Sequence, residues 1–230
     1  MKIYGGITDD NGLTTSIRAM HLQQALIGVS NDNIMGFDKI GYQRKEAVVS
    51  SFAQYLGVNA MSTVNDDTVG RIAMSKNPLD LALSQKGYFQ VQGADGVKLT
   101  RDGRFKLDKD GNLLTNTDEK VLANNGMPIK FSTIPKDLQS IKVDVTGKIS
   151  IYNPETLSLN EVATLGVVSD QGVAVLDPDV RQGYNEYSNV QLASEFLRAM
   201  PALRNFDANR RMFIVQSASM TKVIGMLSQQ

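Results

Sequence analysis

A seven-residue repeat of apolar side chains runs through residues 186–230 and restricts what this chain can fold into. The repeat has no polar exception and consists of Leu192, Ala199, Phe206, Phe213, Met220 and Leu227. Apolar residues seven apart lie on one stripe of an α-helix, and a long stripe favours packing against another helix. The sequence therefore predicts a long C-terminal helix whose apolar seam needs a helical partner.

A second stripe with the same spacing lies near the other end of the chain, over residues 13–35. Thr and Ser residues at 14–16 can cap the start of a helix there. We predict that this helix pairs with the C-terminal one, because neither stripe is expected to form a stable helix alone. The predicted assembly seam consists of Leu13, Met20, Ile27, Ile34, Leu192, Phe206, Phe213, Met220 and Leu227.

The middle of the chain, residues 64–185, has the pattern of short β-strands. The segment "LDLALS" at 79–84 places its three leucines on one face of a strand. Further short apolar runs are joined by Asp-Gly, Asn-Gly and Thr-Gly pairs, which favour tight hairpin turns. No helix-length pattern separates these runs, so antiparallel pairing is predicted rather than a series of parallel strands.

Together these patterns predict an α+β protein. The two ends of the chain form a discontinuous, coiled-coil-like helical domain, and an antiparallel β-rich domain is inserted between them. We expect the N-terminal helix and its connecting segment in residues 1–63, the β-rich domain in 64–185 and the C-terminal helix in 186–230.

The charge balance and the absence of cysteine argue against several classes of protein. The chain has 24 basic and 24 acidic residues, which gives no electrostatic argument for a nucleic-acid partner. It has no cysteine, which excludes thiol catalysis, cysteine-ligated zinc and disulfides. The first residues lack the basic head and apolar stretch of a secretory signal, and no segment approaches the length of a transmembrane helix.

No set of residues indicates an enzyme. The one histidine, His21, lies within the N-terminal helix pattern, and the sequence names no partner that would make it a catalytic base. The sequence contains no nucleophile-elbow, zinc-protease or phosphate-loop motif. We therefore predict that the protein is not an enzyme and has no cofactor, no metal and no small-molecule substrate.

Two acidic stretches in the β region leave alternatives open. "DKDGN" at 108–112 offers oxygen ligands for calcium, but its glycine comes too early for an EF-hand loop, so we favour a hairpin turn. "RDG" at 101–103 is interpreted as a turn in which Arg101 and Asp102 form a salt bridge, with a binding feature as the alternative.

Pro201 lies inside the predicted C-terminal helix. A proline in a helix interior removes a backbone hydrogen bond and costs about 3 kcal/mol. Two interpretations follow: a kink in one long helix, or a short helix over 189–200 followed by a long helix whose first turn contains Pro201.

Three stretches of the sequence resemble the rod and hook family of bacterial flagellar axial proteins. In residues 87–115 the matching positions are Gly87, Phe89, Val91, Thr100, Arg101, Asp102, Gly103, Phe105, Asp108, Gly111 and Leu113. In residues 188–227 they are Ser188, Asn189, Val190, Arg204, Phe206, Ala208 and Asn209, and in residues 31–44 they are Asn33, Gly41, Tyr42 and Arg44.

The resemblance implies a structural subunit of the flagellar basal-body rod that polymerises through its terminal helices into a torque-transmitting tube. It also implies export through the flagellar type III apparatus without a cleaved signal, and partners that are copies of itself and other rod and hook proteins. The short β region favours a proximal or distal rod protein over a hook protein. The alternative outside the family is a calcium- or carbohydrate-binding β module with helical appendages, based on Asp108, Asp110 and Asn112.

Overall fold

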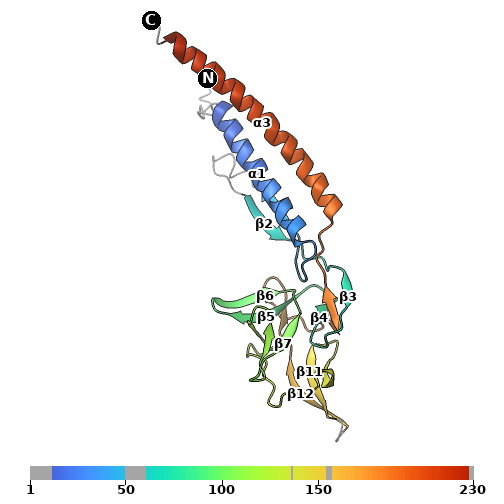
Figure 1. Cartoon of the computed structure of the whole chain (residues 1–230). Coiled ribbons are helices and arrows are strands. Elements are labelled where there is room, and N and C mark those ends of the chain that lie inside the picture. Colours follow the sequence, from blue (N-terminus) through green and yellow to red (C-terminus); the bar gives the residue numbers. More distant parts are fainter. Residues whose placement is uncertain (1–11, 50–60, 136, 154–156, 228–230) are drawn as a thin grey trace, which may run out of the picture. The chain divides into compact units, whose positions relative to one another are not determined.

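The computed structural model describes residues 12–49, 61–135, 137–153 and 157–227, and the chain forms two compact units (Figure 1). Unit 1 contains residues 1–34, 45–65 and 191–230, and unit 2 contains residues 35–44 and 66–190. Each unit is therefore built from segments that are far apart in the sequence.

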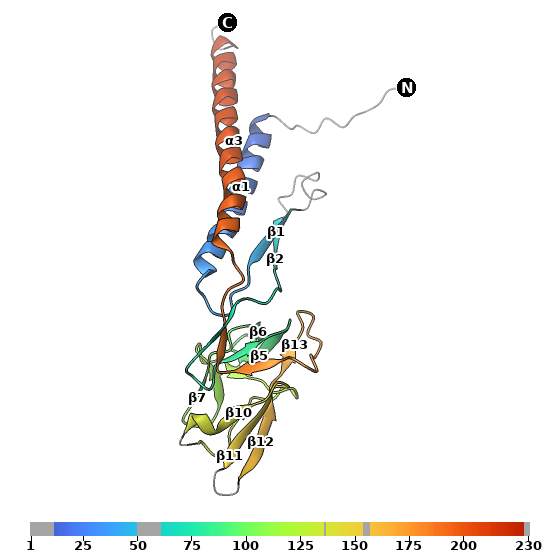
Figure 2. The same cartoon turned by 90° about the vertical axis from the view of Figure 1, so that its right-hand side faces the viewer.

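Unit 1 is mainly helical. The helices are α1 (Gly12–Gly36), which extends two residues past the unit's boundary, and α3 (Leu192–Leu227), and they lie side by side in both views (Figures 1 and 2). Unit 1 also contains an antiparallel pair of strands, β1 (Lys45–Val49) and β2 (Met61–Asn65), which the sequence patterns did not predict.

Unit 2 contains the remaining strands and is β-rich, as predicted. They are β3 (Ile72–Met74), β4 (Leu81–Leu83), β5 (Tyr88–Gly93), β6 (Gly96–Thr100), β7 (Phe105–Leu107), β8 (Leu113–Thr115), β9 (Lys120–Val121), β10 (Ile141–Val143), β11 (Lys148–Asn153), β12 (Ser158–Thr164), β13 (Val167–Val168), β14 (Val180–Gln182) and β15 (Tyr184–Glu186), with a 3-10 turn η1 (Leu138–Ser140). The α+β class is confirmed, with a helix near each end of the chain and strands between them.

The strands of unit 2 form small sheets. A six-stranded sheet has the order β13-β5-β9-β8-β7 with β6 paired to β5, and a three-stranded sheet has the order β10-β11-β12. Two ribbons, β14-β4 and β15-β3, complete the described part. Every strand pair among the described residues is antiparallel, as the hairpin turns predicted.

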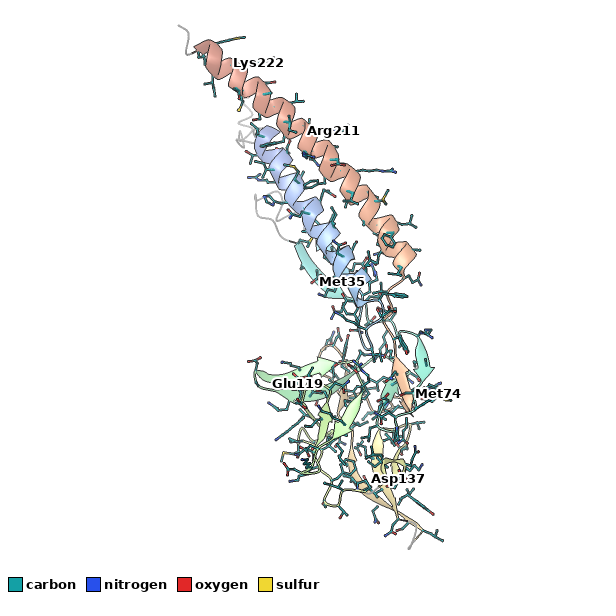
Figure 3. All side chains as sticks on the ribbon, viewed as in Figure 1. Met35, Met74, Glu119, Asp137, Arg211 and Lys222 are labelled. Carbon is teal, nitrogen blue, oxygen red and sulfur yellow. The ribbon has the colours of Figure 1, made fainter. Side chains whose placement is uncertain are left out.

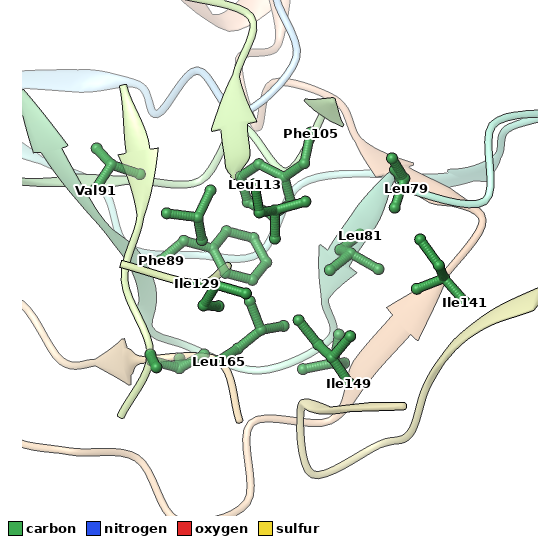
Figure 4. Close-up of a cluster of buried hydrophobic side chains, with 14 of the residues drawn as sticks. Leu79, Leu81, Phe89, Val91, Phe105, Leu113, Ile129, Ile141, Ile149 and Leu165 are labelled. Atoms are coloured by element: carbon green, nitrogen blue, oxygen red, sulfur yellow. The ribbon is translucent and has the colours of Figure 1, made fainter. Parts of the chain in front are cut away.

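One apolar core holds these sheets together (Figure 4). Phe89 and Phe105 meet edge to face, with ring centroids 5.2 Å apart, and Leu81 and Leu83 of β4 are fully buried beside them. Asp80 is also buried, because Asn77 and Asn185 donate hydrogen bonds to its carboxylate. Both faces of the "LDLALS" strand are therefore covered by the protein.

α3 is one continuous helix of 36 residues with Pro201 inside it. The interpretation of a separate short helix ending before Pro201 is therefore wrong. Pro201 lies on the exposed side of α3, and the residue four positions earlier, Leu197, is exposed as well. Water can hydrogen-bond the carbonyl that proline leaves without a helical donor, which makes this side the least costly place for it.

Replacing Pro201 by alanine is expected to stabilise the helices of unit 1, by up to about 3 kcal/mol, because the missing helical hydrogen bond is restored. Thermal melts followed by circular dichroism at 222 nm measure this. Ala208→Pro, at another exposed position of α3, is the matched control and should lower the melting temperature. An unchanged melting temperature in the alanine variant would contradict this account of Pro201.

Candidate functional site

The two helices of unit 1 run antiparallel, and their two described contacts are separated by the same number of residues on each helix. Asn33 Nδ2 of α1 donates a hydrogen bond to Glu195 Oε2 of α3 at 3.1 Å. At the other end, a Cβ added to Gly12 would lie only 2.4 Å from Gln216 Nε2, so these two residues are in close contact. The contacts are 21 residues apart on each helix (33 − 12 and 216 − 195), which places three seven-residue repeats of each helix alongside the other.

The side chains buried deepest along this pair are small or polar. On α1 they are Ser16, Ser30 and Asn33, and on α3 they are Glu195, Ala199 and Ala202. Small side chains let two helices approach closely. Of the three residues on α3, only Ala199 belongs to the apolar repeat seen in the sequence, although the spacing of 195, 199 and 202 alternates four and three and is a detectable helical pattern.

The structure divides the predicted assembly seam into two groups. Half-buried members within the described pair are Leu13, Met20, Ile27, Ile34, Leu192, Phe206 and Phe213. Met220 and Leu227 are exposed, at 44% and 68%. They lie on the part of α3 that continues past Gln216, the residue in contact with the first residue of α1.

We call residues 217–227 the α3 overhang. It carries a run of exposed apolar side chains, including Val223, Ile224 and Met226, and among the described residues none covers them. Figure 3 shows side chains projecting from this end of α3 around the labelled Lys222. An apolar surface of this kind on a helix indicates a protein contact.

Asn33 also holds the start of β1. Its Oδ1 accepts a hydrogen bond from the Lys45 backbone N–H and its Nδ2 donates one to the Lys45 carbonyl, both at 2.8 Å. A side-chain amide paired in this way acts as one rung of a β ladder. Asn33 therefore joins α1, β1 and α3 within unit 1.

In unit 2, a buried ion pair joins the "RDG" segment to the end of β15. Arg101 and Glu186 are 3% and 4% exposed, and Arg101 Nε donates to Glu186 Oε2 at 2.8 Å. The Arg101 guanidinium also donates to the carbonyl oxygens of Leu83, Gln85 and Gly87. The predicted salt bridge between Arg101 and Asp102 is wrong: the Asp102 carboxylate binds Arg104 instead, at 2.6 Å.

Asn189, also in unit 2, connects two further segments of the chain by hydrogen bonds. Its Oδ1 accepts from the Arg44 backbone N–H at 2.7 Å, and its Nδ2 donates to the carbonyls of Asp66 and Thr68. The Arg44 side chain in turn lies 3.2 Å from the Asp66 carboxylate. We call Arg44, Asp66, Arg101, Glu186 and Asn189 the crossing cluster.

The crossing cluster brings together residues from all three motif stretches that carry the family resemblance. Two glycines allow the close approach. A Cβ on Gly103 would lie 1.7 Å from the Leu81 carbonyl oxygen, and Gly41 has φ +70° with its Cβ position 2.3 Å from the Asp102 nitrogen. These motif residues therefore pack closely and tie distant chain segments together.

Among the described residues, the sequence candidates for catalysis and for metal binding are His21 and the acidic stretch at 108–112. His21 is exposed on α1. Among the residues that the structure describes, no group of three histidine, cysteine or acidic residues is placed to hold a metal ion. Asp108 Oδ1 accepts from the N–H groups of Asp110 and Asn112, and its Oδ2 accepts from the Asn112 amide. With Gly111 at φ +82°, this geometry favours the hairpin turn.

An open hollow of about 580 Å³ lies against the β11–β12 hairpin. Its lining includes Lys130, Asp137, Tyr152 and Glu161, and the Glu161 carboxylate is already paired with Lys148 at 2.7 Å. The lining mixes opposite charges with one aromatic ring, and it shows no convergent set of polar groups that would favour a carbohydrate module.

Three aspartates make the stability of unit 2 sensitive to acid. A hydrogen bond from the Thr68 hydroxyl, supported by Arg44, lowers the pKa of Asp66, and the Asn112 amide lowers the pKa of Asp108. Burial raises the pKa of Asp144, but hydrogen bonds from Thr146 and the Lys148 N–H outweigh it and lower the pKa.

Because these folded-state pKa values lie below the ordinary 3.8, the carboxylates stabilise the fold above that pH. We expect their contribution to be lost as the pH falls through the folded-state values, below about 4. Melting temperatures of unit 2 between pH 6 and 2.5 measure this loss. Asp108→Asn should lower stability at pH 6 and flatten the acid dependence, whereas Asp95→Asn, at an exposed turn, should leave both unchanged.

Comparison with known proteins agrees with the motif stretches. Residues 82–151 match the family model of the flagellar hook protein FlgE/F/G D1 domain. The chain is 25% identical to the flagellar basal-body rod protein FlgG of Bacillus subtilis, with 98% of each chain covered. The chain is related to the flagellar basal-body rod proteins.

The chain is also similar to basal-body rod proteins of other bacteria. FlgG of Agrobacterium fabrum is 25% identical, with 86% of this chain and 92% of that protein covered. FlgF of Caulobacter vibrioides is 27% identical, with 88% and 92% covered. All three relatives are named flagellar basal-body rod proteins. No helix in the described residues has the length and apolar character to cross a membrane.

Proposed function

We propose that this protein is a subunit of the flagellar basal-body rod that polymerises through its terminal helices into an axial tube. The observation that carries this proposal is the α3 overhang, where seam residues Met220 and Leu227 extend past the described helix pair and are exposed. A seven-residue apolar repeat that continues beyond its intrachain partner is suited to a coiled-coil-like contact with a neighbouring subunit.

The antiparallel pair of α1 and α3 supports the mechanical part of the proposal. Paired helices along a tube axis and β domains around them give a stiff subunit, and the buried polar contacts of the crossing cluster resist separation of the chain segments in unit 2. Such a tube would transmit torque.

The partners are other copies of this chain and other rod and hook components, and the subunit reaches the basal body through the flagellar type III export apparatus. The nine-residue assembly seam and the domain division at residues 1–63, 64–185 and 186–230 stay predictions. The proximal and distal rod positions are both open, since relatives named FlgG and FlgF match.

The test replaces Met220 and Leu227 by glutamate in the full-length chain. Both side chains are exposed in the described structure, so helicity and melting temperature should be unchanged. Burying two carboxylates in a subunit contact is costly, so incorporation into basal bodies and motility in soft agar should be lost. Thr221→Glu/Lys222→Glu, on another side of the same helix turns, is the matched control and should assemble. Normal incorporation of the Met220→Glu/Leu227→Glu variant would refute the proposed contact.

A further inference from the structure

Unit 2 has a polar hollow of about 300 Å³ that carries two positive charges, and we call it the Lys76 hollow. Lys76 and Lys142 line it, both are exposed, and neither has an ion-pair partner among the described residues. Asp80 is buried behind Ser75 and Asn77, which line the same hollow and donate hydrogen bonds to its carboxylate. Two unpaired ammonium groups at one hollow favour an anionic partner.

The floor of the Lys76 hollow is held in place by one side chain. Gln182 Nε2 donates hydrogen bonds to the carbonyl oxygens of Pro78 and Ile141, at 2.9 and 2.8 Å. Its Oε1 accepts a hydrogen bond from the Val143 N–H at 3.1 Å. These bonds tie β14 to β10 and to the segment before β4. The hollow is therefore preformed, and a partner that enters it loses little free energy in ordering it.

An apolar side chain next to an acid projects from another part of unit 2, and we call residues 175–179 the Leu176 loop. Leu176 is 92% exposed, the largest value among the large apolar side chains of the described residues. Asp177 is also exposed and has no ion-pair partner in the described part of the chain. Backbone hydrogen bonds hold both ends of the loop, from the Val175 N–H to β13 and from the residue after β4 to the Asp179 carbonyl.

We propose that the Leu176 loop of one subunit docks at the Lys76 hollow of a second copy of this chain. In this contact the Asp177 carboxylate lies between the ammonium groups of Lys76 and Lys142. Leu176 packs against Met74, which comes just before the hollow's first lining residue and is 79% exposed. Each surface offers an apolar side chain beside a charge, and the charges are opposite in sign. Because Leu176 is almost fully exposed, the loop does not fill the hollow of its own chain.

This inference rests on the proposed function and adds a subunit contact outside the terminal helices. The loop and the hollow are different parts of unit 2, so the contact joins two copies head to tail. Each copy at the end of a row keeps one unused surface, and repetition of the contact gives an open helical array when it does not close into a ring. An array of this kind suits the β domains around an axial tube.

The test expresses the full-length chain in a flagellated strain from which its own gene has been deleted. Lys76→Glu/Lys142→Glu reverses the charge of the hollow, and Asp177→Lys reverses the charge of the loop. All three side chains are exposed, so melting temperatures should be unchanged. Each variant should lower incorporation into isolated basal bodies at least about tenfold, because like charges then meet across the contact. Combining the three substitutions makes the charges opposite again and should restore most of the incorporation.

Lys109→Glu/Lys120→Glu is the matched control. It makes the same change in net charge at two exposed lysines of unit 2 outside the hollow and should incorporate as the parent does.

Engineered cysteines test the contact directly, because the chain has none of its own. Gln139 is exposed and lines the hollow, so basal bodies of the Gln139→Cys/Leu176→Cys chain should give a ladder of linked subunits with a short bifunctional thiol reagent. Gln139→Cys/Leu157→Cys places the second thiol at another exposed leucine and should give no ladder.

Four results would overturn the proposed contact. They are normal incorporation of a charge-reversed variant, a combined variant no better than its parts, an equal loss in Lys109→Glu/Lys120→Glu, and basal bodies that contain the Gln139→Cys/Leu176→Cys chain without a ladder. In each case the parent chain still incorporates, and the proposed rod function stands. A parent chain that failed to incorporate would refute the rod function itself, and the contact with it.

Discussion

Replacing Arg101 by methionine is expected to destabilise unit 2 by about 3–5 kcal/mol, the cost of breaking a buried ion pair by removing one partner. Glu186 would keep the Gly70 N–H as a donor, at 2.9 Å, but would remain a buried charge without its cation. Three backbone carbonyls would lose their donor in the same variant.

Urea unfolding followed by tyrosine fluorescence measures this loss, since five of the seven tyrosines lie in unit 2 and tryptophan is absent. Lys148→Met breaks an exposed ion pair with Glu161 and is the matched control, for which only a small shift is expected. The double variant Arg101→Met/Glu186→Leu should recover part of the lost stability, because no unpaired charge stays buried. A single variant as mild as Lys148→Met would contradict the role given to this pair.

Deletion of residues 191–230 is expected to abolish incorporation into the basal body completely and to leave unit 2 folded. The truncated chain lacks α3 and therefore both the helix pair and the α3 overhang, whereas Val190 is buried within unit 2 and has to be retained. The two compact units provide the physical reason why one can be lost without the other.

The measurement compares tyrosine fluorescence and urea midpoints of the truncated and full chains, together with a motility assay. Deletion of residues 217–230 is the matched control. It removes the α3 overhang but keeps the contact between Gly12 and Gln216. This shorter deletion should keep α3 paired with α1 and still fail to assemble. Assembly of either truncated chain would argue against helix-mediated polymerisation.

The sequence by itself determined the kinds of element and their order. Seven-residue repeats gave helices near both ends, and Gly-containing turns between short apolar runs gave antiparallel strands, because these patterns depend on local backbone geometry. The motif residues Arg101, Gly103 and Asn189 were also identifiable, since the family resemblance marks them. Their roles were not, and the predicted pairing of Arg101 with its neighbour Asp102 was wrong.

Only the tertiary structure decided which distant residues meet. Arg101 binds Glu186, 85 positions later, and Asn33 binds Glu195, 162 positions later. The repeats predicted large apolar side chains at the centre of the helix pair, but small and polar ones are buried deepest. A periodic pattern gives the face of a helix that is covered, whereas the partner and the register depend on hydrogen bonds between segments that only folding brings together.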